Sequence, residues 1–349
     1  AETAILIIYT GGTFGMIPKS PQEPALVPFD FEQIIERIPE LNFFDCALTV
    51  IAFEPLLDSS NVNPTHWVRM AEIIEEHYPL YDGFVVLHGT DTMAYSAAAL
   101  SFMLENLRKP VIFTGAQLPI GTIRNDARRN LVTAIEIASA KNKQGEPVVS
   151  EVGIYFNDLL LRGNRASKEE SIYFDAFRSV NYPALAQVGV NILYNYAALM
   201  PLQSEAYSLQ VFKNMDSHVG ILKLFPGIQP AMLEAVLGTA SLKGLVLETY
   251  GSGNAPTDGW FTEILAQAIR QGLVVFNVSQ SSGGRVMQGK YATSSHLAQI
   301  GVVGGGDIHT EAALTKMMYL LAKYPTDLAQ VKRALALPLR GEMSLLAEV

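Results

Sequence analysis

The sequence predicts an α/β fold with two three-layer α/β domains whose sheets are mainly parallel, a larger N-terminal domain and a smaller C-terminal one. Short apolar runs that end in glycine-bearing or polar turns recur along the chain, which is typical of strands buried in a parallel sheet. Segments with helix start signals follow most of these runs. With 349 residues, 49% of them hydrophobic, the chain can bury two such cores.

We expect the N-terminal domain to span residues 1–190 and the C-terminal domain residues 218–349, with a linker over 191–217. The pattern becomes irregular between Tyr182 and His218, and we interpret that stretch as the remaining strands of the first domain and the linker. The expected strands of the first domain are 4–9, 50–53, 83–87, 110–114 and 152–156. The expected strands of the second domain are 219–224, 244–247, 273–278 and 300–303, and its expected helices are 230–237, 260–270, 311–323 and 327–335.

The first strand leads directly into the turn Thr10-Gly11-Gly12-Thr13. Glycine at positions 11 and 12 allows positive φ and the close approach of another backbone or a ligand. Thr13 can therefore project into the crevice at the carboxyl end of the strand, where open α/β sheets bind ligands. A phosphate cradle is not favoured, because no Gly-Lys-Ser or Gly-Lys-Thr follows at P-loop spacing.

The segment from 18 to 28 carries four prolines, too many for a helix or a central strand. Because this long loop leaves from the Thr13 turn, we interpret it as a lid over a site. Asp30 and Gln33 match a capping box for a short helix that ends near Ile38.

The polar cluster Asp58-Ser59-Ser60-Asn61 separates the second strand from a helix with Asn63 as its cap and Pro64 in its first turn. The apolar residues of that helix share one face: Trp67, Met70, Ala71, Ile74 and Tyr78. From the residues alone, we interpret the polar cluster as cap and turn chemistry.

The third strand ends in His88-Gly89-Thr90-Asp91-Thr92, ahead of an apolar helix over 93–107. A buried strand again delivers threonine hydroxyls, here beside the carboxylate of Asp91. Because the carboxyl ends of parallel strands meet at one edge of a sheet, Thr13 and Thr90 are expected to face a common crevice. We interpret His88 as a structural histidine rather than a catalytic base.

The fourth strand ends in Gly115-Ala116-Gln117-Leu118-Pro119, and Asp126 opens a helix that runs to about Lys141. The strand over 152–156 precedes the loop 161–168. Taken alone, this loop predicts only a solvated surface charge for Lys168.

Composition excludes several classes of function. A net charge of −9 with a pI near 5.2 argues against nucleic acid or an anionic membrane as a partner. Cys46 is the only cysteine, and the six histidines include no His-x-x-x-His pair, so we expect no disulfide, no metal and no cofactor. The first apolar run is too short for a signal peptide or a membrane span, so the chain is expected to be cytoplasmic or to have lost a leader.

The two threonine turns resemble the signature segments of the bacterial-type L-asparaginase family. Thr10-Gly11-Gly12-Thr13 fits one signature, although Phe14 stands where isoleucine or valine is usual, and residues 83–93 fit the other throughout. Further segments are similar to the cytoplasmic type I branch: Asp58-Ser59-Ser60, Arg162-Gly163-Asn164-Arg165 with Lys168, Phe174-Asp175-Ala176-Phe177, Tyr250-Gly251-Ser252-Gly253-Asn254-Ala255-Pro256 and Leu339-Arg340-Gly341-Glu342. The resemblance covers essentially the whole chain and implies a homodimer or homotetramer whose larger domain holds the site.

The resemblance also implies an activity, the hydrolysis of L-asparagine to L-aspartate and ammonia through a threonine acyl-enzyme, without cofactor or metal. It implies Thr13 as the acylated nucleophile and Thr90, Asp91 and Lys168 as a second hydroxyl–carboxylate–amine set. The implied substrate-binding residues are Asp58, Ser59, Ser60 and, through its backbone, Ala116. A threonine hydroxyl is a weak nucleophile at neutral pH, so it needs a base within hydrogen-bond reach.

Two positions depart from the family pattern. The lid reads Pro24-Ala25-Leu26-Val27-Pro28, without the tyrosine that usually covers the nucleophile. Glu248 aligns where some members have an arginine in a regulatory asparagine site, and a carboxylate cannot pair with the carboxylate of an effector. The alternatives are a glutaminase-asparaginase of the same family, the amidotransferase subunit that supplies ammonia to a charged tRNA, and a catalytically silent amino-acid-binding protein.

Overall fold

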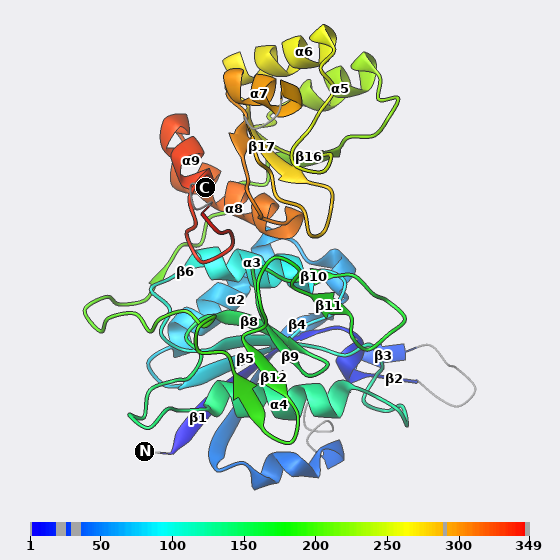
Figure 1. Cartoon of the computed structure of the whole chain (residues 1–349). Helices are drawn as coiled ribbons and strands as arrows, with labels where there is room; N and C mark the ends of the chain where they lie inside the picture. The colour runs from blue at the N-terminus through cyan, green and yellow to red at the C-terminus, as the bar shows by residue number, and fades with distance from the viewer. Residues whose placement is uncertain (1, 19–25, 29–35, 289–291, 346–349) are drawn as a thin grey trace. The chain divides into compact units, whose positions relative to one another are not determined.

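Figure 1 shows the computed structural model, which describes residues 2–18, 26–28, 36–288 and 292–345. The chain divides into two compact units, Ala1–Lys213 and Asn214–Val349. Each unit contains a mainly parallel sheet, so the predicted α/β class with a larger N-terminal domain is confirmed. The boundary between the units falls within the stretch 191–217 that the sequence suggested as a linker.

The parallel part of the large sheet consists of β4 (Cys46–Leu57), β1 (Thr3–Gly11), β5 (Gly83–Leu87), β7 (Val111–Thr114) and β8 (Val152–Phe156), as neighbours in that order. The second strand of this sheet in chain order, β4, lies on one side of β1, and all later parallel strands lie on the other side. The chain order therefore reverses at β1. A reversal of this kind is the switch point at which doubly wound sheets bind ligands.

Three antiparallel strands complete the sheet of eight: β9 (Leu159–Arg162), β12 (Ala186–Val188) and β13 (Ile192–Tyr194). The sequence pattern predicted no strand at β9, and it suggested further strands of the first domain between Tyr182 and His218, where β12 and β13 lie, without giving their bounds. Asn157 and Asp158 have positive φ values of 43° and 71° and turn the chain back after β8. The edge strand β13 belongs to the first unit because it pairs with β12, although its residues fall within the expected linker.

Helices cover both faces of the large sheet (Figure 1). On one face, α4 (Ala127–Ser139) shares a core with the side chains of Ile5, Ile7 and Tyr9 from β1. The other face carries α3 (Met93–Met103), which packs on β7 and β8, and α2 (Pro64–His77), which packs on α3. With helices on both faces, β1 is buried from Ile5 to Gly11, which explains its continuous apolar sequence.

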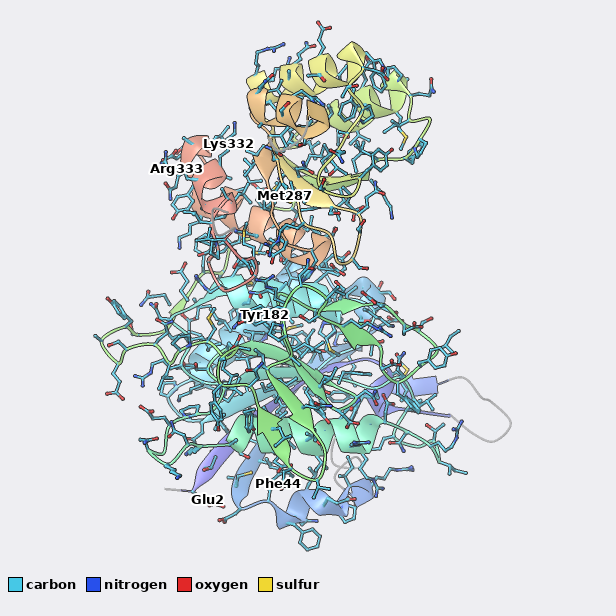
Figure 2. All side chains as sticks on the ribbon, in the orientation of Figure 1. Glu2, Phe44, Tyr182, Met287, Lys332 and Arg333 are labelled. Atoms are coloured by element: carbon cyan, nitrogen blue, oxygen red, sulfur yellow. The ribbon has the colours of Figure 1, made fainter. Side chains whose placement is uncertain are left out.

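An ion pair with an aromatic neighbour anchors β9 in the sheet. The guanidinium of Arg162 contacts Glu151 at 2.6 Å, and both side chains are buried. The ring of Tyr182, which Figure 2 labels, lies 4.3 Å from the Arg162 guanidinium carbon. Met200 also donates its backbone amide to Glu151, at 2.7 Å. These contacts hold the strand that precedes Lys168.

The second unit has a parallel sheet of β15 (Val219–Lys223), β16 (Gly244–Thr249), β17 (Val274–Ser279) and β18 (Val303–Gly304), in that order. The expected helices appear as α5 (Pro230–Leu237), α6 (Gly259–Arg270), α8 (Thr310–Lys323) and α9 (Leu328–Leu335). A helix that was not expected, α7 (Ala292–Gln299), lies between β17 and β18.

Short elements surround these sheets. The antiparallel pairs are β2 (Met16–Pro18) with β3 (Leu26–Pro28), β6 (Leu104–Glu105) with β14 (Gln210–Val211), and β10 (Ser167–Lys168) with β11 (Phe177–Arg178). Single 3₁₀ turns are η1 (Thr13–Gly15), η2 (Pro39–Phe43) and η3 (Ser59–Asn61). Most of the expected lid and the Asp30–Gln33 capping box lie outside the described residues.

Candidate active site

Glycines allow the polar turns of three neighbouring strands to touch. Gly12 has a φ of 87°, and a Cβ built there would lie 2.5 Å from the Cα and the amide nitrogen of Gly89. A Cβ on Gly89 would in turn lie 2.5 Å from Ser59 Oγ. The backbone of the turn after β5 therefore lies too close to Gly12, and the Ser59 side chain from the turn after β4 lies too close to Gly89, for a side chain at either glycine position. Thr13 directly follows Gly12, and Thr90 directly follows Gly89.

Thr13 begins the single 3₁₀ turn η1, and its side chain is half-buried. The Gly12 amide donates to the carbonyl of Leu57 at 2.9 Å, which fixes the turn to the end of β4. Phe14, the residue that departs from the family pattern, is fully buried in the core between the sheet and α4. The larger side chain at this position is accommodated in the core and leaves the Thr13 turn at the sheet edge.

Lys168 connects the two polar residues that follow Gly89. Its Nζ donates to Thr90 Oγ1 at 2.8 Å and to Asp91 Oδ1 at 2.7 Å. The Lys168 side chain is 17% exposed and that of Asp91 is 63% exposed, so the group lies at the edge of the solvent. The surface position that the loop alone predicted for Lys168 is thus replaced by a contact with the threonine turn, as the family resemblance implied.

Gln117 links Thr90 to the loop between β10 and β11. The Thr90 hydroxyl donates to Gln117 Oε1 across 3.3 Å, while Gln117 Nε2 donates to the carbonyls of Tyr173 at 3.0 Å and Glu170 at 3.4 Å. The sequence pattern placed Gln117 in a polar strand-end turn but assigned it no role. Its position next to Ala116 was the only local signal.

The turn after β4 brings Asp58, Ser59 and Ser60 to the same edge. Asp58 Oδ1 accepts the Ser60 amide at 2.9 Å, and the Ser59 carbonyl accepts the Thr92 hydroxyl at 2.7 Å. Ser59 is buried against Gly89, whereas Asp58 and Ser60 are exposed. A carboxylate and a hydroxyl are thus presented beside the threonine turns.

Asp126 fixes the backbone around Ala116. Its carboxylate accepts the Gln117 amide at 2.9 Å and the Leu118 amide at 3.0 Å. The sequence predicted Asp126 as the start of a helix, and it does occupy the N-cap position of α4, but its side chain makes no capping hydrogen bond there. Asn130 donates to the carbonyl of Gly115 at 2.9 Å and holds the other end of the turn.

His88 has a structural environment, in agreement with its interpretation from the sequence. Its Nδ1 lies 2.6 Å from the carbonyl of Gly89, and its Nε2 lies 2.8 Å from Ser96 Oγ, to which Trp67 Nε1 also donates. A neutral ring with the proton on Nδ1 satisfies all of these contacts. Complete burial lowers the pKa of His88 from 6.5 to about 4, so the imidazole stays neutral near pH 7.

Within residues 2–18, 26–28, 36–288 and 292–345, no group of three or more His, Cys, Asp or Glu side chains is arranged to hold a metal ion. In the same ranges, no helix is both long and apolar enough to cross a membrane.

Models of known protein families match the chain in both units. The family described as "Asparaginase, N-terminal" matches residues 4–200, and "Glutaminase/Asparaginase C-terminal domain" matches residues 218–335. The chain is 40% identical over 344 residues to L-asparaginase 1 of Escherichia coli strain K12, with 98% of both chains covered. It is also 40% identical to the 60 kDa lysophospholipase of Mus musculus, over 99% of this chain and 63% of that protein.

The solved structures include a similar fold. The crystal structure of L-asparaginase I from Vibrio cholerae matches with a TM-score of 0.89 and 37% sequence identity, over 99% of this chain and 100% of that one. The similarity therefore extends from the threonine turns through both units. The family that the two signature segments predicted is confirmed, and this chain belongs to the asparaginase family.

Proposed function

We propose that the chain is an L-asparaginase that hydrolyses L-asparagine to L-aspartate and ammonia through an acyl-enzyme on Thr13. The observation that carries the proposal is the contact of Lys168 Nζ with both Thr90 and Asp91 at the switch point of the large sheet. The 40% identity to E. coli L-asparaginase 1 supports the choice of substrate.

The amino-acid end of asparagine binds at the turn after β4. Asp58 is an exposed carboxylate that can pair with the α-amino group, and the hydroxyls of Ser59 and Ser60 donate to the α-carboxylate. Asp91 also reaches the amine. The side-chain amide then lies toward the backbone of Ala116, whose turn Asp126 holds in place.

The reaction begins when Thr13 Oγ attacks the side-chain carbonyl carbon. A C–O bond forms, the C–N bond breaks, and ammonia leaves with the proton that Thr13 releases. Backbone amides at the Thr90 and Ala116 turns stabilise the oxyanion. A water molecule then attacks the ester, which restores the Thr13 hydroxyl and releases L-aspartate.

Thr90, Lys168 and Asp91 move the protons. In the resting state the Thr90 hydroxyl donates to Gln117 across a long 3.3 Å hydrogen bond and accepts from Lys168 at 2.8 Å. A long bond of this kind is weak, so the substrate amide or the hydrolytic water can replace Gln117 as the partner of Thr90. Thr90 then passes protons between the reacting atoms and Lys168, whose charge Asp91 balances.

The direct test is a coupled ammonia assay with L-asparagine and L-glutamine over a range of concentrations. We expect a preference for asparagine, because the extra methylene of glutamine misplaces the carbonyl, and pocket discrimination at this level is roughly 1–3 kcal/mol. Equal kcat/KM values would instead favour the glutaminase-asparaginase alternative. Binding without ammonia release would favour a silent amino-acid-binding protein.

A matched pair of lysine variants tests the proton-handling role. Lys168→Gln should lower kcat by about 10²-fold or more, the usual effect of losing a positioned acid–base group. Lys143→Gln removes the same charge from an exposed turn and should leave kcat unchanged. Equal kcat values for the two variants would contradict the role of Lys168.

We also propose that the chain forms a homodimer or homotetramer and works in the cytoplasm, as the type I resemblance implies. Light scattering should then give two or four times the chain mass of 38.1 kDa. A fully active species with the mass of one chain would contradict the oligomer.

A further inference from the structure

A cavity lies in the first unit, at the opposite edge of the large sheet from the candidate active site. Its volume is about 380 Å³, within the usual range for small-molecule sites. Asp82 and Lys109 in its wall precede β5 and β7, and Tyr78 and Lys141 follow α2 and α4. The threonine turn follows the other end of β5, and five strand residues separate the two edges by about 15 Å.

The wall of this cavity is basic, although the whole chain carries a net charge of −9. Arg108, Lys109 and Lys141 line it together with a single carboxylate, that of Asp82. Asp82 is already engaged, because it accepts the Ala4 amide at 2.8 Å and Lys141 Nζ at 3.0 Å. The cavity therefore retains an excess of positive charge.

The guanidinium of Arg108 is only weakly paired. It approaches Glu205 at 3.4 Å, and the Glu205 side chain is 88% exposed, so solvent screens this contact. The Arg108 backbone amide, in contrast, donates to the Tyr78 hydroxyl at 2.9 Å. The backbone is fixed, while the side chain can exchange Glu205 for another anion.

Lys109 is held rigidly in the wall. Its Nζ donates to the carbonyls of Tyr78 and Tyr81, the latter at 2.7 Å, and lies 4.6 Å from the centre of the Tyr78 ring. An ammonium has three donors, and among the residues that the structure describes only these two carbonyls accept from it. The third donor remains for a ligand.

Aromatic surface stands beside these cations. The Tyr78 ring stacks on Phe84 with an interplanar angle of 3° and forms a firm part of the wall. Tyr207 also lines the cavity, and 60% of it is exposed, which makes its ring available to a planar group. The site thus combines fixed cationic donors with an exposed ring.

We propose that this cavity binds a nucleoside monophosphate or a closely similar phosphate monoester with a flat ring. The phosphate accepts from Arg108, Lys109 and Lys141, since a planar guanidinium and ammonium groups both suit phosphate oxygens. The flat ring lies against Tyr207. The site is separate from asparagine hydrolysis and does not depend on the proposed function.

Titration calorimetry of the whole protein at about 0.1 M salt tests the proposal, with AMP, adenosine and inorganic phosphate as the probes. AMP should bind saturably and about tenfold more tightly than phosphate or adenosine alone, because only AMP engages both the cations and the ring. L-Aspartate, the product expected at the other edge, should not displace AMP. Displacement by L-aspartate would place AMP at the threonine turns and overturn the proposal.

Matched variants locate the site. Arg108→Gln and Tyr207→Ala should each weaken AMP binding by about tenfold. Arg69→Gln removes an exposed cation of α2 that does not line the cavity and should leave the affinity within about twofold, since exposed charges away from the cavity are screened. Absence of saturable AMP binding at millimolar concentration, or equal weakening by Arg69→Gln and Arg108→Gln, would refute the proposal. Unchanged circular dichroism shows that each variant is folded.

Discussion

The contact between Gly12 and Gly89 provides the sharpest test of how the fold positions the threonines. In a Gly12→Ala variant, the new Cβ would lie 2.5 Å from two backbone atoms of Gly89, at a residue with a φ of 87°. With a ψ of −178°, Gly12 lies in a backbone region that is essentially restricted to glycine, which costs alanine about 1–3 kcal/mol, and overpacking adds about 1–3 kcal/mol. The turns must therefore separate, and a misplacement of about 1 Å lowers kcat by about 10²-fold.

Gly145→Ala is the matched control for this variant. Gly145 has a similar φ of 81°, but no heavy atom lies within 4 Å of the position that a Cβ would take there, so the variant suffers the backbone strain without the collision. Urea unfolding should show a loss of about 1–2 kcal/mol for Gly145→Ala and about 2–6 kcal/mol for Gly12→Ala. The ammonia assay should give normal kcat for Gly145→Ala alone. If Gly12→Ala kept a kcat within about twofold of the control, the close packing of the two turns would not be what positions Thr13 and Thr90.

Three further perturbations test other parts of the structure. The pKa of His88 is about 4 in the folded chain and 6.5 in the unfolded reference state, so between these pH values the unfolded chain binds a proton on His88 that the folded chain does not. The free energy of unfolding should therefore be unaffected above pH 6.5 and fall by about 3 kcal/mol toward pH 4, and unfolding curves of His88→Gln should lack this loss. Lys316 and Glu342 form a fully buried ion pair at 2.7 Å, so Glu342→Gln should destabilise the chain by about 3 kcal/mol or more because it leaves Lys316 without a counter-charge. Glu72→Gln removes an exposed ion pair with Arg69 and should cost under about 1 kcal/mol, and equal urea midpoints for the two variants would contradict this. With Glu248 in place of the arginine, rate curves for asparagine should be hyperbolic, and a sigmoidal curve that substitution of Glu248 abolishes would show that an effector site is present.

Much of the fold was predictable because buried parallel strands have a distinctive sequence pattern. The strand predicted over 83–87 is β5 (Gly83–Leu87), since both of its faces are covered and every position is apolar or glycine. The proximity of the turns that carry Thr13 and Thr90 followed from the same reasoning, because parallel strands deliver their carboxyl ends to one edge. The chemical roles of these residues came from the family resemblance and not from the pattern.

The position of Lys168 could not be predicted locally. Its strand, β10, has two residues, and its place depends on antiparallel pairing of Ser167 with Arg178 and Lys168 with Phe177. Such long-range pairs leave no periodic signal in so short a segment. The turn that precedes β9 did carry a signal, since Asn157 and Asp158 are both residue types that tolerate positive φ better than other non-glycine residues.

The contact between the threonine turns was hidden for a different reason. Glycine at positions 11 and 12 indicated a close approach of a backbone or a ligand, but only the sheet order, with β1 beside β5, shows that Gly12 approaches the turn at Gly89. Asp126 was hidden in a similar way, because an acidic residue before a helix is usually its cap. The Asp126 carboxylate could accept the free amides at the start of α4, but it accepts the Gln117 amide instead.

Mass spectrometry of enzyme quenched rapidly during turnover of L-asparagine tests whether Thr13 is the nucleophile. We expect an aspartyl adduct on the peptide that contains Thr13. Thr13→Ala should abolish both the adduct and turnover while substrate binding survives, and Thr90→Val should retain the site of labelling but lose about 10²-fold or more in turnover. An adduct on the peptide that contains Thr90, still formed by Thr13→Ala, would contradict the assignment of Thr13 as the nucleophile.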